Sequence, residues 1–193
     1  MLKRADEAAT EVIKVYTNGS SHDGVVGASA ILTRRGKLTC TLKLHLGKAD
    51  EHIIYEAELV GLMLGLHLIR IEKKSQKSCV IGADNQAVLT VMHSDMTRPG
   101  QHIAAEFLRI ATPGKVEGLR GNKNYSLSLC WTAGHVGIKG NEKVDKEAKS
   151  AAARQSSVAD SQQTSQDIYE RRSNGVPLHK SKHSMKRRRT AGK

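Results

Sequence analysis

The chain has 193 residues, enough for one domain of ordinary size plus additional chain, and such a domain buries a core without disulfide or metal staples. Its 31 basic and 19 acidic residues give a net charge of +12. A basic surplus of this kind favours polyanions, of which nucleic acid is the commonest. Basic surface that only keeps a protein soluble is the alternative that charge leaves open.

A membrane protein is not expected from this sequence. The N-terminal residues lack the apolar segment of a secretory signal. The most apolar stretch, 53–69, is interrupted by Glu56, Glu58 and His67. It is too short and too charged to span a bilayer, so we interpret it as a buried helix.

The three cysteines, Cys40, Cys79 and Cys130, are widely spaced and each lies in or beside an apolar run. This pattern favours buried free thiols in strands, because a zinc site needs tighter ligand spacing. Free thiols in turn favour a reducing compartment, the cytoplasm or the nucleus.

Taken in chain order, hydrophobic periodicity and turn residues predict five strands and four helices. The predicted strands cover 11–17, 25–33, 38–46, 78–83 and 125–131. The predicted helices cover 53–70, 85–93, 101–111 and 141–153, the last behind a glycine-rich loop at 132–140. Short turns make the first three strands an antiparallel meander, whereas strands separated by helices need crossovers and lie parallel. We therefore expect an α/β fold with a mixed five-stranded sheet flanked by helices.

Composition divides the chain into a lead-in at 1–10, a domain at 11–153 and a tail at 154–193. The tail holds 10 Lys/Arg and 3 Asp/Glu, and its first part is rich in Ser and Gln with few large apolar residues. Such a segment is expected to be disordered. Its polybasic stretch at 180–189 fits a nuclear localisation signal or a nucleic-acid tether, and equally a solvated tail.

Four acidic or near-acidic residues stand near the ends of predicted elements: Asn18 after the first strand, Glu58 early in the long helix, Asp84 after the fourth strand, and Asp145 on the last helix. His135 lies in the loop before that helix. Singly, each residue has an ordinary structural explanation, and for His135 that is a polar loop residue.

Those ordinary explanations are specific. Asn18 with Gly19 forms a turn, and Glu58 complements a helix N-terminus. Asp84 caps the next helix, and Asp145 pairs with Lys149 one turn later.

Taken together, these residues and their contexts resemble the ribonuclease H family. The matching segments are YTNGS around Asn18, AEL around Glu58, ADNQA around Asp84, and WTAGHVGIKGNEKVDKEAK, which carries the loop histidine and the helix aspartate. The last segment is the most specific. The resemblance spans about 11–153, in the family's order, and is greatest to ribonuclease H domains of fungal retroelements and their reverse transcriptases.

The resemblance implies hydrolysis of the RNA strand of RNA/DNA hybrids by two Mg²⁺ ions, with Mn²⁺ as a substitute. It implies metal and catalytic positions at Asn18, Glu58, Asp84 and Asp145, with His135 assisting proton transfer or product release. It further implies that residues beside the site contact the sugar-phosphate chain and the 2′-hydroxyl, namely Gly19, Ser20, Asn85 and Gln86.

Asn18 departs from the family, which usually has an aspartate touching both metals at this position. An amide is neutral and cannot bridge two cations as a carboxylate does. We expect weaker metal binding and strongly reduced hydrolysis, with duplex binding retained. Asp23 can substitute only if its turn folds back. Decay of a retroelement copy, deliberate substitution, and reversion to aspartate by deamidation of Asn18–Gly19 each account for the residue.

Two functions compete, with a third behind them. The first is a hybrid-specific endoribonuclease, part of a larger reverse-transcribing polyprotein. The second is a catalytically inactive module of the same fold that binds nucleic acid or a protein. Asn18 favours the second, and the intact Glu58, Asp84, Asp145 and His135 favour the first. A third function, integrase-like DNA strand transfer, is disfavoured by the GHVGIKGNEKVD segment. Because the sequence has few aromatic residues, we expect it to bind nucleic acid through the sugar-phosphate backbone rather than by base stacking. The affinity should therefore fall steeply with salt.

Overall fold

A computed structural model of the chain describes residues 13–72, 78–91, 100–111, 126–134 and 136–153. The predicted lead-in and basic tail, and residues 11, 12, 92, 93 and 125 of three predicted elements, lie outside these ranges. Within them, no helix is long and apolar enough to cross a membrane.

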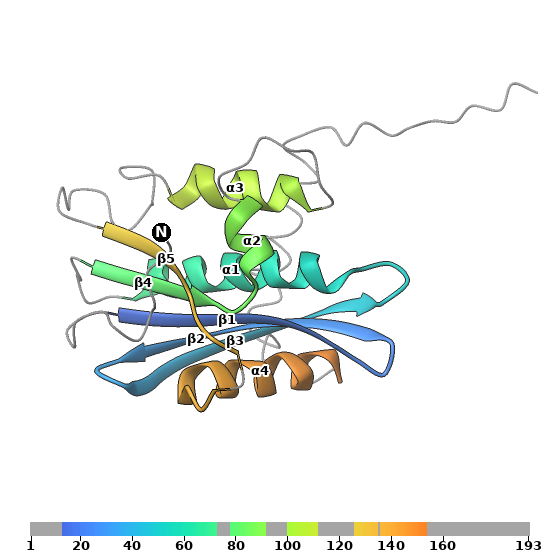
Figure 1. The fold of residues 1–193 in the computed structure, drawn as a ribbon, viewed down its shortest axis with the longest axis horizontal. Coiled ribbons are helices and arrows are strands. Elements are labelled where there is room, and N and C mark those ends of the chain that lie inside the picture. The colour runs from blue at the N-terminus through green and yellow to red at the C-terminus, as the bar shows by residue number, and fades with distance from the viewer. Residues whose placement is uncertain (1–12, 73–77, 92–99, 112–125, 135, 154–193) are drawn as a thin grey trace, which may run out of the picture.

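A single five-stranded sheet forms the centre of the molecule (Figure 1), with strand order β3-β2-β1-β4-β5. The strands are β1 (Ile13–His22), β2 (Val25–Arg34), β3 (Lys37–Lys48), β4 (Ser78–Ala83) and β5 (Ser126–Trp131). Strands β1, β2 and β3 pair antiparallel, and β1, β4 and β5 pair parallel. The predicted mixed sheet is confirmed.

Helices cover both faces of this sheet (Figure 1). Helices α1 (Ile54–Ile71), α2 (Gln86–Val91) and α3 (Gln101–Ala111) lie on one side, and α4 (Lys139–Ala152) lies on the other. Helix α1 crosses the middle of the sheet and contacts β1 to β4, so its long apolar sequence is buried as the hydropathy predicted.

Alternation along β1 sends its side chains to two different cores. Ile13 and Val15 belong to the large core beneath α1, whereas Tyr16 joins Ile31 and Val144 beneath α4. Residue 18 has the same parity as Tyr16, so its side chain projects toward α4.

Most predicted bounds agree within two residues, and β4 and α3 agree at both ends. The exception is β1, which was expected to end at Thr17 and continues to His22, paired with β2 throughout. The interpretation of Asn18–Gly19 as a turn is therefore wrong, because these turn-forming residues are held in the ladder and the hairpin turn falls at Asp23–Gly24. The cysteines lie on β3, β4 and β5 and form no disulfide, and Cys79 and Cys130 are buried as predicted, whereas Cys40 is partly exposed.

Candidate active site

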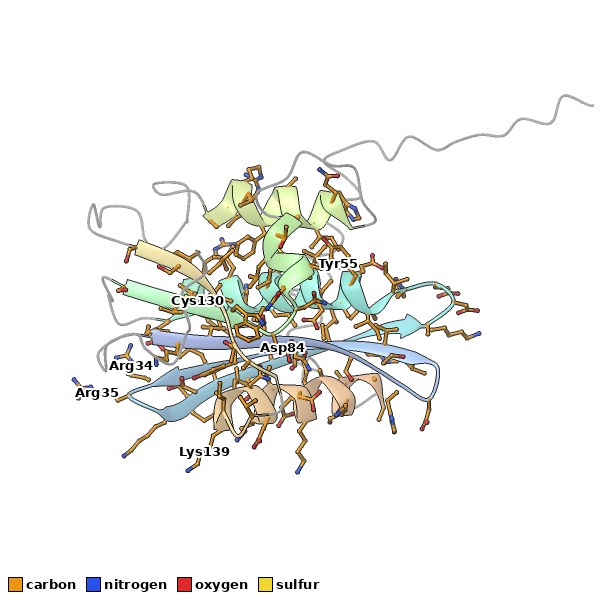
Figure 2. All side chains as sticks on the ribbon, viewed as in Figure 1. Arg34, Arg35, Tyr55, Asp84, Cys130 and Lys139 are labelled. Atoms are coloured by element: carbon orange, nitrogen blue, oxygen red, sulfur yellow. The ribbon has the colours of Figure 1, made fainter. Side chains whose placement is uncertain are left out.

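The site lies at the end of β4, beside β1, which continues past this point. The last parallel pair between β1 and β4 is Thr17 with Ala83, so Asn18 and Asp84 are the next residues on adjacent strands. Carboxyl ends of parallel strands are the usual place for a ligand site in α/β sheets. Asp84 is partly exposed, and Figure 2 labels it near the centre of the view.

Glu58 reaches this point because α1 lies very close to β1. A Cβ added at Gly19 would lie 2.5 Å from the Glu58 nitrogen and 2.7 Å from the Ala57 carbonyl carbon, so only glycine permits this approach. The Gly19 N–H and the Asn85 side chain donate hydrogen bonds to the Glu58 carboxyl. Glu58 is the fifth residue of α1, and it is Glu56 that occupies the first turn.

The Glu58 carboxyl is buried, at 5% exposure, and its Oε2 has no hydrogen-bond partner among the described residues. Burial, followed by the nearby charges of Asp84 and Asp145, raises the pKa of Glu58 to about 8. The two donated hydrogen bonds oppose this shift without cancelling it. Any cation that binds beside this buried carboxyl would stabilise its ionised form.

Asp145 is hydrogen-bonded at both carboxylate oxygens. The Asn18 amide Nδ2 donates to its Oδ1 at 3.0 Å, and Lys149 Nζ donates to its Oδ2 at 2.7 Å. The expected pair between Asp145 and Lys149 is thus confirmed. Position 18 supplies a donor here where a carboxylate would supply only acceptors.

Asp84 is fixed from three directions. The indole Nε1 of Trp131 donates to its backbone carbonyl at 3.0 Å, and Asn141 Nδ2 donates to its Oδ2 at 3.2 Å. Gly134 lies so close that an added Cβ would meet Asp84 Oδ2 at 3.2 Å. The interpretation of Asp84 as the cap of α2 is wrong, because Asn85 Oδ1 accepts from the amides of Ala87 and Val88 instead.

Two further buried polar atoms close to Asp84 have no hydrogen-bond partner among the described residues: Asn141 Oδ1 and Thr132 Oγ1. Their residues are 2% and 1% exposed. Buried polar atoms are normally satisfied, and a cluster of exceptions beside carboxylates marks a place where water or an ion binds.

Sequence reasoning missed Asn141 and Trp131 as parts of the site. A signal for Asn141 was present, because Asn141, Asp145 and Lys149 are each four residues apart and so share one face of α4. Trp131 carried no comparable signal, since its role depends on the parallel register that sets it opposite Ala83.

The remaining predicted residues have mixed outcomes. Gly19 and Asn85 contact Glu58, as described above. Ser20 is buried in β1, and Gln86 is exposed at the start of α2. Their nucleic-acid contacts stay predictions. His135 lies outside the described residues.

Asp23 does not replace the missing carboxylate. It stands in the hairpin turn with a positive φ of 49°, and its carboxylate lies 3.4 Å from His22 Nε2. Four residues of extended strand lie between it and Asn18, so the two positions are about 16 Å apart along the chain.

The residues suit a divalent cation on one side of the site only. Glu58 and Asp84 present hard oxygen ligands, one of them without a partner, as Mg²⁺ prefers. Asn18 and Asp145 are joined to each other, and Asp145 also to an ammonium. Within the described ranges, no three His, Cys, Asp or Glu side chains are placed to hold one metal ion together.

No model of a known protein family matches the chain. Solved structures do. The N-terminal RNase H domain of a Mycobacterium tuberculosis protein, determined as a fusion with maltose-binding protein, is 16% identical with a TM-score of 0.54, over 74% of this chain and 95% of that one. LC11-RNase H1 in complex with an RNA/DNA hybrid is 15% identical with a TM-score of 0.55, over 74% and 97%.

The chain has the ribonuclease H fold. A third structure, RNase H1 from Halobacterium salinarum, is 17% identical with a TM-score of 0.50 and is covered over 98% of its length. Within this ribonuclease H-like domain, Asn18, Glu58, Asp84 and Asp145 come together from β1, α1, the end of β4 and α4. Identities this low carry the fold and not the activity.

Proposed function

We propose that the chain is a ribonuclease H-type nuclease domain that acts on RNA/DNA hybrids with hydrolysis strongly reduced by Asn18. The observation that carries this is the convergence of Glu58, Asp84 and Asp145 on Asn18 at the end of the β1–β4 pair. One of the similar structures, LC11-RNase H1, is a complex with an RNA/DNA hybrid.

In this proposal Glu58 and Asp84 hold a divalent cation, Mg²⁺ or Mn²⁺. A divalent cation held there would supply charge neutralisation at the phosphate and an activated water for attack on it. The chain's own residues prepare the place: Trp131 and Asn141 orient Asp84, and Gly19 and Asn85 orient Glu58. Asn18 gives the site one negative charge fewer than an aspartate at the same position would.

A second candidate, an inactive module that binds nucleic acid, is favoured by one observation. The hydrogen bond from Asn18 to Asp145, together with the ion pair from Lys149, satisfies Asp145 without any metal. A folded and preorganised site of this kind retains its surface for a duplex after losing hydrolysis.

The test compares cleavage of an end-labelled RNA/DNA hybrid by the parent and by Asn18→Asp, in Mg²⁺ and in Mn²⁺. Asp84→Asn is the inactive control, and Asp23→Asn is the matched control for an exposed carboxylate. We expect at least a tenfold faster rate from Asn18→Asp than from the parent. Equal rates would show that Asn18 does not limit hydrolysis.

Binding is measured separately by fluorescence anisotropy in EDTA, with hybrid and with DNA duplex over a range of salt. We expect preference for the hybrid and affinity that falls steeply with salt, because contacts to the phosphate backbone release counterions. Absence of hybrid binding would reject both candidates while leaving the fold unaffected.

The cellular context is a proposal of its own. The segments EHIIYEAELVGLMLGLHLIR around Glu58 and DNQAV at Asp84 are similar to those of fungal retroelement ribonuclease H domains, so we propose an origin within a reverse-transcriptase polyprotein that acts in the cytoplasm or nucleus. The polybasic segment at 180–189 suits nuclear import or nucleic-acid tethering.

A further inference from the structure

The carboxylates of Asp145 and Glu58 differ in the groups that already bind them. Asp145 accepts from Asn18 at one oxygen and from Lys149 at the other, at 3.0 and 2.7 Å. Each carboxylate oxygen can accept a second contact, so a metal ion that ligated Asp145 would share these oxygens with the amide and would lie beside the ammonium, whose positive charge opposes its binding.

Glu58 offers the opposite situation. Its Oε2 is buried and has no hydrogen-bond partner among the described residues, and the charge of Asp84 lies close enough to raise its pKa. Asp84 in turn receives the neutral amide of Asn141 at one oxygen. Within the described site, no cation bonds to Glu58 or Asp84, so this side retains negative charge that a metal ion can neutralise.

The charge of the whole site agrees with a single ion. Glu58, Asp84 and Asp145 contribute three negative charges when all of them are ionised, and Lys149 contributes one ammonium within hydrogen-bond distance of Asp145. The formal charge is then −2, which one divalent cation balances. An aspartate at position 18 in place of the amide would add one further negative charge.

We propose that this site binds one divalent cation, on Glu58 and Asp84, and that Lys149 occupies the place of a second cation at Asp145. The inference deepens the proposed function, because it concerns the metal content of the same site. It also identifies Lys149, in the last turn of α4, as a residue that weakens the binding of a second ion at Asp145.

Lys149 lies near the surface, where it can be substituted with little effect on the core. Its side chain is 52% exposed, whereas that of Asp145 is 21% exposed. Replacing Lys149 therefore removes a charge without leaving a cavity in the core. Lys146, exposed on the same helix one position off this face, is a matched control.

The experiment counts bound Mn²⁺ by electron paramagnetic resonance of the free ion, on the full chain without nucleic acid. We expect one ion on the parent and on Lys146→Met. Asn18→Asp with Lys149→Met is expected to bind two ions, with the second at least tenfold tighter than in Asn18→Asp alone. Lys149→Gln in place of Lys149→Met should give the same result, and circular dichroism confirms that each variant is folded.

Two results would overturn the inference. One is a parent that binds two ions of similar affinity, or none. The other is a second-ion affinity in the double variant no different from that of Asn18→Asp alone. Neither result bears on hybrid binding in EDTA, so failure of the ion count is distinguishable from failure of the proposed function.

Discussion

Restoring a carboxylate at position 18 has a stability cost that the structure allows us to estimate. Asn18→Asp removes the amide that donates to Asp145 Oδ1 and puts two carboxylates about 3 Å apart at a residue that is 5% exposed. Two unit charges at this separation repel by roughly 5 kcal/mol at an effective dielectric constant of 20. Proton uptake by the pair limits the loss, so we expect a free energy of unfolding lower by about 3 kcal/mol at pH 8.

The assay is urea denaturation and thermal melting in EDTA, repeated with saturating Mg²⁺. A loss of about 3 kcal/mol corresponds to a melting temperature lower by roughly 6–12 °C for a protein of this size. Saturating Mg²⁺ is expected to recover most of the loss in Asn18→Asp and to stabilise the parent less, because the variant gains a metal ligand. Lowering the pH toward 5 should also recover stability, since a shared proton replaces the lost hydrogen bond.

Asn18→Ala separates the hydrogen bond from the charge. It removes the donor without adding a carboxylate, so we expect a loss of about 1–2 kcal/mol that neither Mg²⁺ nor pH recovers. If Asn18→Asp were as stable as the parent in EDTA at pH 8, the contact between Asn18 and Asp145 would be refuted.

Three other perturbations follow from the same geometry. The folded pKa of Glu58, about 8, exceeds its ordinary value of 4.5, so the native state holds a proton that the unfolded chain loses. Stability should fall between about pH 4.5 and 8 by at most roughly 4–5 kcal/mol, and Glu58→Gln should flatten this dependence in metal-free urea titrations. Gly19→Ala places a methyl against α1 backbone and should destabilise the fold by about 3 kcal/mol in urea, whereas Ser20→Ala at the next position should change it far less. Asn141→Leu removes the amide that orients the Asp84 carboxylate through its Oδ2. It should weaken Mn²⁺ binding severalfold, measured by the same ion count, with little change in hybrid affinity. Unchanged Mn²⁺ affinity would show that Asn141 does not contribute to the site.

Much of the fold was predictable because its elements carry strong local signals. Alternation identified β3 and β5, and the long apolar run identified α1. The end of β1 was not predictable in the same way. The residue types from Asn18 to His22 are typical of a turn, and pairing with Val25–Ser29 of β2 keeps them extended. Tertiary pairing overrides local propensity there.

The site shows the same division between local and long-range information. Helical spacing places Asn141, Asp145 and Lys149 on one face of α4, so this part of the site can be predicted from the local sequence. The bond between Asn18 and Asp145 spans 127 residues of sequence and depends on α4 docking against β1. Part of that docking is the contact of Gly140 with the Tyr16 ring, which no local pattern indicates.

Asn18 changes the balance between stability and metal affinity in the site. A cluster of carboxylates repels itself and is held together by the cations it binds, so strong metal affinity and low metal-free stability have one origin. Here an amide and an ammonium satisfy Asp145 from within the protein, which removes part of that repulsion. The same two donors share the oxygens that a second cation would ligate, and the ammonium repels such a cation. We therefore expect a site of this composition to be more stable without metal and to bind metal more weakly, so the stability of Asn18→Asp in EDTA and its gain of ions should change together.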